Sequence, residues 1–340
     1  MCNEMTSVLV SIIIPIFNME KYLAKCLESV FQQTFSSFEV IAINDGSTDK
    51  SESIIDSFSQ EYPNRITKIN KENGGLASAR NCAFDLVQGK YVTFLDADDY
   101  LAPDYLKTLV EKAELDALDM VCSGQHKVTE DGEILKTIKY RVVNGQCLQR
   151  RLNISGKLYR TEYVMKNDIH FPEGKEYEDN SFNLQAMFLS DKVGFLEYEG
   201  YYQVVHEGSI TSKPIRADRL PFEEWEAVVA RVRSENERNA DIELFDFTFM
   251  SLVTYLLMVR CRGREYLDNK EGYTASDTAV IVKRIQAMVV ELFPDYMKNR
   301  YRMITREWRL SILQKMATTI FYCFCRRNML GMAVQVFHAL

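Results

Sequence analysis

The architecture can be inferred first from residues 8–45, which read VLVSIIIPIFNMEKYLAKCLESVFQQTFSSFEVIAIND. Val8–Ile16 is rich in β-branched residues, which suits a strand buried on both faces. Lys21–Gln33 has the spacing of an amphipathic helix, and Phe38–Ile43 is a second apolar strand. One side of the predicted helix carries Tyr22, Leu23, Leu27, Val30 and Phe31. The stretch therefore predicts a strand, a helix and a second strand in succession.

The same alternation continues to about residue 120. The further predicted elements are a helix at Ser51–Gln60, a strand at Arg65–Ile69, a helix at Ala77–Val87, a strand at Tyr91–Leu95 and a helix opened by Pro103. Such alternation predicts an α/β fold with a mainly parallel sheet and helices on both faces. Ligands of these sheets bind at the carboxyl ends of the strands.

The chain changes character after Pro214. Residues 221–338 show long helical periodicities, and Pro294 is their main interruption. We therefore expect an α-helical C-terminal region, with residues 1–217 forming the α/β domain and residues 218–340 the helical one.

Three polar clusters follow three of the predicted strands. Asn44–Ser47 follows the second strand, Asn73–Gly75 the third and Asp96–Asp99 the fourth. Because the carboxyl ends of parallel strands lie at one edge of a sheet, these clusters should lie close together. We therefore expect the functional site at this edge.

Asp96 and Asp98 are two carboxylates spaced so that they can approach one divalent ion. Their hard oxygens suit Mg²⁺ or Mn²⁺, which keep open positions for phosphate oxygens. The alternative is a solvated acidic loop before the next helix. We favour a metal site, because an apolar strand precedes these acids and other polar clusters share their edge.

Other polar residues each admit a functional and a structural interpretation. Asp45 can accept a hydrogen bond from a nucleotide base or ribose, or it can belong only to a turn. Arg80 can bind phosphate or sugar oxygens, or form a surface ion pair. Glu178 and Asp179 can serve catalysis, or simply favour the start of a helix. His206 can touch a metal or diphosphate, or be structural.

Composition limits the class of protein. The chain has 340 residues, of which 46% are hydrophobic and 26% charged, as in a globular protein. The net charge of −7 argues against nucleic-acid binding. The eight cysteines form no CxxC pair, so we expect reduced thiols in a cytoplasmic protein. No apolar run reaches the roughly 18–20 residues of a membrane span.

Seven segments together resemble the family 2 glycosyltransferases, which have the Rossmann-like GT-A fold. In chain order they are SIIIPIFNMEKYLAKCLESVFQQT, VIAINDGSTDKS, NKENGGLASARN, KYVTFLDADDYL, GKLYRTEYV, FPEGKEYEDNSF and HEGSITS. They extend from Ser11 to about Ser212, roughly 60% of the chain. Two positions depart from the family pattern: Phe17 stands where Tyr is frequent, and Gln203 stands where an arginine is frequent.

The resemblance implies a role for each candidate residue. Pro15 and Phe17 would line the base pocket, Asp45 would hold the base, and Arg80 would lie by the phosphates or sugar. Asp96 and Asp98 would bind the metal, with Asp98 the more direct ligand. Asp179 would be the catalytic base, and Glu178 would support the acceptor or metal region. His206 and Ser209 would approach the diphosphate.

The function implied is an inverting glycosyl transfer from a nucleotide diphosphate sugar, with UDP favoured, to a saccharide or lipid-linked acceptor. Asp179 would act as the base and take the proton of the acceptor hydroxyl as that hydroxyl attacks the donor sugar. Two alternatives are a haloacid-dehalogenase-type phosphatase, which also has a DxD after a strand, and a non-catalytic nucleotide-sugar-binding module. Both metal acids and the candidate base are present, which argues against the latter.

The C-terminal region contains a basic segment. Residues 296–327 carry eight Lys or Arg and one acid, a charge of +7. Lys298, Arg302, Arg306 and Arg309 would share one face of a helix. This helix can pack on the catalytic domain with a solvated basic edge, or contact the anionic inner face of a membrane where a lipid-linked acceptor lies.

Overall fold

The computed structural model describes residues 8–142, 147, 150–206, 215–235, 241–260, 275–302 and 312–339. The chain divides into two compact units, each described here by itself. The first unit comprises Met1–Cys147, Leu152–Gly174 and Glu178–Gly208, and the second comprises Leu148–Arg151, Lys175–Tyr177 and Ser209–Leu340.

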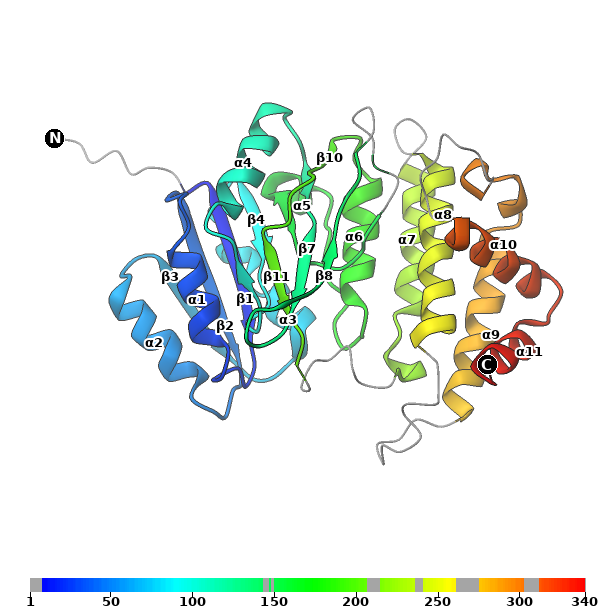
Figure 1. Cartoon of the computed structure of the whole chain (residues 1–340), viewed down its shortest axis with the longest axis horizontal. Helices are drawn as coiled ribbons and strands as arrows, with labels where there is room; N and C mark the ends of the chain where they lie inside the picture. Colours follow the sequence, from blue (N-terminus) through cyan, green and yellow to red (C-terminus); the bar gives the residue numbers. More distant parts are fainter. Residues whose placement is uncertain are drawn as a thin grey trace. The chain divides into compact units, whose positions relative to one another are not determined.

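The first unit is built on a seven-stranded sheet with the strand order β10-β6-β9-β4-β1-β2-β3 (Figure 1). Its strands are β1 (Val10–Ile16), β2 (Phe38–Asp45), β3 (Ile66–Lys71), β4 (Tyr91–Phe94), β6 (Met120–Cys122), β9 (Lys157–Arg160) and β10 (Val193–Phe195). Only β9 runs antiparallel to its neighbours, β4 and β6. The sheet confirms the predicted mainly parallel architecture.

Helices cover both faces of this sheet. They are α1 (Leu23–Phe31), α2 (Ser51–Glu61), α3 (Gly75–Asn81), α4 (Tyr105–Leu115), α5 (Thr161–Lys166) and α6 (Glu178–Phe188). The chain moves outward from β1 to β3 and then returns past β1 to β4. Because such crossovers are right-handed, α3 lies on the face opposite α1 and α2.

The side chains of β1 alternate between two buried clusters. Ile12 and Ile14 join a core that includes Leu27 of α1 and Leu109 of α4. On the other face, aromatic rings pack around Phe94 of β4. These rings belong to Phe84, Tyr159, Phe171 and Phe182. Strand β1 is therefore buried on both faces, as its mostly apolar sequence predicts.

One predicted helix is interrupted. The expected helix at Ala77–Val87 is observed as α3 followed by a separate 3-10 turn, Phe84–Leu86 (η1). At the junction the Ala83 N–H donates to the Arg80 carbonyl three residues back. This tighter hydrogen bond ends the α-helical ladder soon after Arg80.

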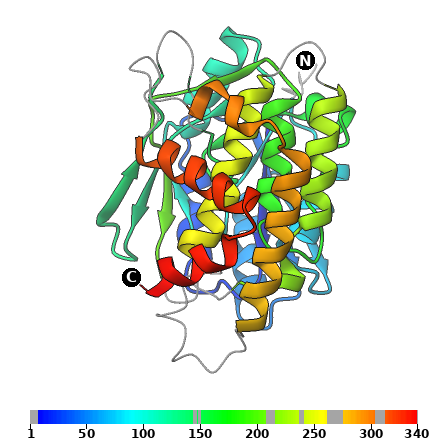
Figure 2. The same cartoon turned by 90° about the vertical axis from the view of Figure 1, so that its right-hand side faces the viewer.

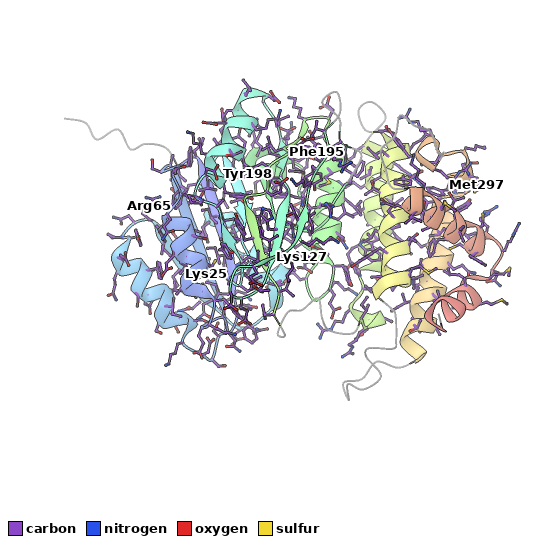
Figure 3. The ribbon with its side chains drawn as sticks, viewed as in Figure 1. Lys25, Arg65, Lys127, Phe195, Tyr198 and Met297 are labelled. Atoms are coloured by element: carbon purple, nitrogen blue, oxygen red, sulfur yellow. The ribbon has the colours of Figure 1, made fainter. Side chains whose placement is uncertain are left out.

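A second, four-stranded sheet has the order β5-β11-β7-β8. Its strands are β5 (Tyr100–Leu101), β7 (Gln125–Val128), β8 (Ile134–Ile138) and β11 (Tyr201–Val204). On one face the rings of Tyr100 and Tyr202 stack at 4.7 Å, and the Lys25 ammonium lies 4.1 Å from the Tyr100 ring centroid. Figure 3 labels Lys25 on α1 and Lys127 on β7.

The second unit is helical, as predicted (Figure 2). Its α-helices are α7 (Phe222–Glu235), α8 (Ile242–Tyr255), α9 (Ala275–Leu292), α10 (Ile312–Arg326) and α11 (Leu330–Ala339). Its core contains Trp225, whose ring meets Phe249 edge-on, and Phe293, which stacks on Phe249. Within the described residues no helix is long and apolar enough to cross a membrane.

The prediction of a basic helix beginning near Lys298 is wrong for the part of that segment that the structure describes, which ends at Arg302. Lys298 and Arg302 lie on two 3-10 turns, Tyr296–Lys298 (η5) and Arg300–Arg302 (η6), and Asn299 between them is extended at φ −61° and ψ 124°. The Asn299 amide donates to the Glu243 carbonyl at 2.6 Å, a contact that holds the chain out of helical geometry. Arg306 and Arg309 lie outside the described residues.

Candidate active site

Pro15 and Phe17 lie at the end of β1. Pro15 pairs with Ile43 of β2 and is buried. A proline can occupy this central strand because its missing N–H faces the side where β4 has ended. The last hydrogen bond on that side runs from the Leu95 N–H to the Ile13 carbonyl, 3.0 Å. Phe17, in the loop that follows, is 44% exposed, so its ring is available to a ligand.

The loop after β1 is hydrogen-bonded to the loop after β2. The Asn18 N–H donates to Ser47 Oγ at 3.1 Å, and Asn18 Oδ1 accepts from the Thr48 N–H at 2.8 Å. The Glu20 N–H donates to Asp49 Oδ2 at 2.9 Å. Asn18 has φ 54°, a left-handed conformation that asparagine tolerates better than most residues. These bonds fix the loop that carries Phe17.

Asp45, the last residue of β2, is buried and holds the loop after β3. Its Oδ1 accepts from the Gly74 N–H at 2.9 Å and from the Lys71 ammonium at 2.6 Å. Its Oδ2 accepts from the Gly75 N–H at 2.8 Å. Gly75 has φ 84°, which favours glycine there. Since a carboxylate has about four acceptor positions, Asp45 can still accept from a ligand.

Arg80 joins three segments that are far apart in the sequence. Its side chain is 2% exposed, and its two terminal nitrogens donate to Glu178 Oε1 and Asp96 Oδ1, each at 2.8 Å. Its guanidinium lies over the Phe171 ring, 5.2 Å from the centroid. Burial alone would lower the pKa of Arg80, but the charges of Asp96 and Glu178 outweigh it and raise the pKa. Arg80 therefore remains a fixed cation.

Asp98 and Asp99 differ in their surroundings. Asp99 is buried, and its two oxygens accept from the Tyr201 hydroxyl at 2.7 Å and the Val204 N–H at 2.8 Å. Asp98 has a side chain 20% exposed, with His206 Nε2 at 2.9 Å from its Oδ2. Burial, reinforced by the charge of Asp96, raises the pKa of Asp98. Asp99 thus fixes the loop, while Asp98 faces the site.

His206 follows β11 and is held from two directions. One is the contact with Asp98, and the other is the ring of Tyr22, which stacks on the imidazole at 4.6 Å and 29°. The Tyr22 hydroxyl donates to Glu130 Oε1 at 2.8 Å. Only 6% of the His206 side chain is exposed. The imidazole therefore sits in a defined position beside the DxD loop.

Asp179 lies in the first turn of α6 and is half-buried. Burial raises the pKa of its carboxyl to about 7, with a further contribution from the charge of Glu178. The cations of Arg80 and Lys157 oppose this shift. Lys157 is buried, and its ammonium donates to the carbonyl of Asn153. A carboxyl of this kind exchanges protons near neutral pH, as a general base must.

The donor set at the DxD loop suits a divalent cation. Among the described residues no group of three or more His, Cys, Asp or Glu could hold a metal ion by itself. Arg80 binds one oxygen of Asp96 and His206 meets one oxygen of Asp98, so each carboxylate has a second oxygen available. Mg²⁺ and Mn²⁺ are often bound by one or two carboxylates together with water and phosphate oxygens. Asp96 and Asp98 fit that pattern.

The structure thus brings most of the predicted residues into one region of the first unit. Arg80, Asp96 and Glu178 are in direct contact, Asp98 and His206 form a second pair, and Asp179 adjoins Glu178. Ser209 lies outside the described residues. Local patterns indicated no role for Lys157 or Tyr201. They included Asp99 only as a member of a polar cluster, and they placed Tyr22 on the apolar side of a helix. Partners distant in sequence define Asp99, Tyr201 and Tyr22, whereas Lys157 acts through its charge on Asp179.

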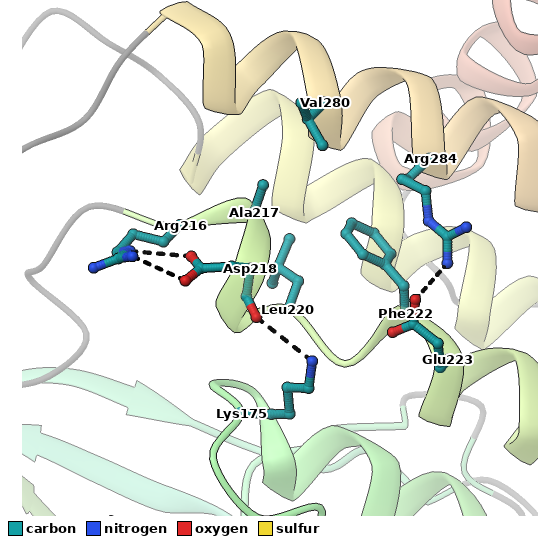
Figure 4. A pocket seen from close by; sticks show the side chains of 9 residues that line it. All are labelled: Lys175, Arg216, Ala217, Asp218, Leu220, Phe222, Glu223, Val280 and Arg284. Carbon is teal, nitrogen blue, oxygen red and sulfur yellow. Dashed lines mark hydrogen bonds and ion pairs between the residues drawn. The ribbon is translucent and has the colours of Figure 1, made fainter.

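A cavity of about 490 Å³ lies in the second unit (Figure 4). Its charged lining includes Arg216, which pairs with Asp218, and Arg284, which pairs with Glu223. It shares no residue with the cluster around Arg80. Both arginines are thus already paired with acids, and we assign the cavity no ligand.

Comparison with known proteins identifies the class of the fold. The S. aureus TarS 1–349 crystal structure in complex with UDP-GlcNAc superimposes with a TM-score of 0.73 at 19% identity, covering 97% of this chain and 91% of that one. The α/β unit with its polar edge therefore has the GT-A fold, followed by helices. Residues 11–167 match the model of glycosyl transferase family 2. This match assigns residues 11–167, just under half of the chain, to that family.

Curated relatives support the assignment. Glycosyltransferase GlyA of Streptococcus pneumoniae is 31% identical over 288 residues, which are 79% of this chain and 39% of GlyA. An uncharacterized glycosyltransferase of Bacillus subtilis, EpsJ, is 32% identical over 222 residues, 61% of this chain and 64% of EpsJ. The chain thus spans less than two thirds of the length of either relative.

Proposed function

We propose that this chain transfers a sugar from a nucleotide diphosphate donor to an acceptor hydroxyl with inversion at the anomeric carbon. The observation that carries the proposal is the Arg80 bridge, with 2.8 Å contacts to both Asp96 and Glu178. Arg80 connects Asp96, which belongs to the proposed cation site, to the first turn of α6, which carries Glu178 and Asp179. Donor-binding and proton-accepting groups are thereby held in one site.

The donor nucleotide would bind along the loops after β1, β2 and β3. Phe17 offers an exposed ring for stacking on a base, and Asp45 has acceptor capacity for a base or ribose donor. UDP is our preferred nucleotide, because the structurally similar TarS has been crystallised with UDP-GlcNAc. The acceptor would be a saccharide or lipid-linked saccharide hydroxyl. Of the two units, the α/β one would bind the donor.

In the proposed mechanism Asp179 accepts the proton of the acceptor hydroxyl. The hydroxyl oxygen forms a bond to the anomeric carbon while the bond from that carbon to the diphosphate oxygen breaks on the opposite side. Asp96 and Asp98 would hold Mn²⁺ or Mg²⁺, which neutralises negative charge on the diphosphate when it is bound. Arg80 keeps Asp96 and Glu178 in place, and its fixed charge favours ionised acids around it.

The test combines binding with turnover. We would measure thermal shifts of the purified chain with UDP, GDP and their common sugar conjugates, with and without Mn²⁺, and then nucleotide release with acceptors. Asp98→Asn should lose the Mn²⁺-dependent shift, whereas Asp179→Asn should keep that shift and lose transfer. Asp191→Asn, at an exposed position, is the matched control and should behave as wild type.

Each negative result has a defined meaning. Nucleotide-sugar binding without release or transfer would favour a non-catalytic binding module. Hydrolysis of phosphomonoesters with no response to nucleotide sugars would favour a phosphatase, an alternative that the family assignment already disfavours. Lys298 and Arg302 lie on separate 3-10 turns and not on one helix. Membrane contact through a continuous basic helix therefore loses support.

A further inference from the structure

The residue before α1 makes contacts that the proposed reaction does not yet account for. Tyr22 was expected on the apolar side of a helix, but its ring stacks on His206 at 4.6 Å and its hydroxyl donates to Glu130 Oε1 at 2.8 Å. Glu130 lies in the turn between β7 and β8, more than 100 residues away, and Lys21 also contacts it at 2.5 Å. Tyr22 is thus held at its hydroxyl while its ring covers the imidazole.

The backbone next to His206 is fixed as well. The Val204 N–H donates to Asp99 Oδ1 and the Val205 N–H to the Val128 carbonyl, each at 2.8 Å. These bonds fix the chain up to His206 but not the rotation of its side chain. Contacts that limit the side-chain rotation include Asp98 at one edge and the Tyr22 ring on one face.

We infer that Tyr22 is a positioning residue that holds His206 against Asp98 and so presets the DxD loop for a cation and diphosphate. The expected effect on cation and diphosphate binding rests on the proposed function. The positioning of His206 by Tyr22 can be measured without any ligand. Lys21 and Glu130 are both largely exposed, so their ion pair contributes little by itself. The stack on His206 is the contact that matters.

The first test observes His206 in the protein without ligand. The chain has only four histidines, so the imidazole signals in an NMR spectrum of histidine-labelled protein can be assigned by substitution. A stacked tyrosine shifts the imidazole proton signals through its ring current. Tyr22→Ala should move and broaden the His206 signal and leave His126 and His170 unchanged. Tyr22→Phe keeps the ring and should leave the His206 signal near its wild-type position.

The second test measures the consequence for ligand binding. Loss of a stacked pair worth about 0.5–1.5 kcal/mol corresponds to an affinity for Mn²⁺ and UDP about 2- to 12-fold weaker, if the preset orientation is required. Tyr22→Phe should restore most of the affinity. Tyr62→Ala is a matched control, because Tyr62 stacks on Phe31 at 3.8 Å elsewhere in the same unit. It should lose stability without moving the His206 signal or the affinity.

The outcomes separate the inference from the proposed function. An unchanged His206 signal in a folded Tyr22→Ala protein would overturn the positioning role. A displaced His206 signal with unchanged affinity for Mn²⁺ and UDP would also overturn it, since the orientation would then have no effect on the site. If wild type itself binds no nucleotide, the proposed function fails, and the NMR comparison still decides whether Tyr22 fixes His206.

Discussion

Asp179→Asn should make the protein more stable while abolishing transfer. Burial and the charge of Glu178 raise the pKa of Asp179 from 3.8 to about 7, so the folded state disfavours the ionised carboxylate. A shift of about three units corresponds to an upper limit of about 4 kcal/mol, since one unit is about 1.4 kcal/mol. Because Asp179 is only half-buried, solvent screening reduces this to an expected 1–2 kcal/mol, roughly. Asparagine carries no charge and relieves that cost.

The size of this stabilisation depends on pH. Above about pH 7 Asp179 is ionised in both the folded and the unfolded state, so wild type bears the full cost. Between pH 7 and 3.8 the folded protein increasingly retains the proton, and below 3.8 the two states are protonated alike. The stabilisation of Asp179→Asn over wild type should therefore be largest at pH 8, smaller at pH 5 and absent below 3.8.

The assay is urea denaturation of wild type and Asp179→Asn at pH 8 and pH 5, with transfer measured in parallel. Asp191→Asn, at an exposed position, controls for the removal of one surface charge and should change stability little. If the variant is less stable than wild type at pH 8, the reasoning that the ionised Asp179 carboxylate destabilises the folded state is refuted. Retained transfer would refute its role as the base.

Further predictions concern Arg80, Gly46 and the pH dependence set by Asp179. Arg80→Ala should lower the free energy of unfolding by about 3–5 kcal/mol in urea denaturation. The substitution removes the buried cation that pairs with Asp96 and Glu178 and leaves both acids unpaired beside a cavity. Gly46→Ala should cost more stability than Gly75→Ala in thermal melts: both have positive φ, but only at Gly46 would the new Cβ meet a backbone atom, Asn73 N at 2.9 Å. The transfer rate at saturating substrates should fall about tenfold per pH unit below about 7 as Asp179 gains a proton.

The sheet and the edge that carries the site were predictable from local patterns. The β-branched, mostly apolar run Val10–Ile16 favours a strand covered on both faces, and the polar residues after each strand mark where it ends. The register then brings Asp45 of β2 opposite Lys71 of β3. Periodicity and strand order therefore account for most of the site's location.

Contacts between distant residues were not predictable in this way. Tyr22 fits the apolar pattern of its helix, and only the position of Glu130 and His206 in the folded chain shows its other role. The segment from Lys298 to Arg302 has helical spacing, but a hydrogen bond from Asn299 to the Glu243 carbonyl holds the backbone in another conformation. Sequence periodicity describes a segment alone and cannot include such partners.

The antiparallel strand β9 has a consequence for biosynthesis. It fills the gap between β4 and β6 but begins at Lys157, whereas β4 ends at Phe94, so 62 residues must be synthesised between them. At roughly 5–20 residues per second, the inner edge of β4 stays unpaired for about 3–12 s on the ribosome. During that interval an apolar strand edge is open to pairing with other chains, which makes the nascent protein a candidate client for chaperones.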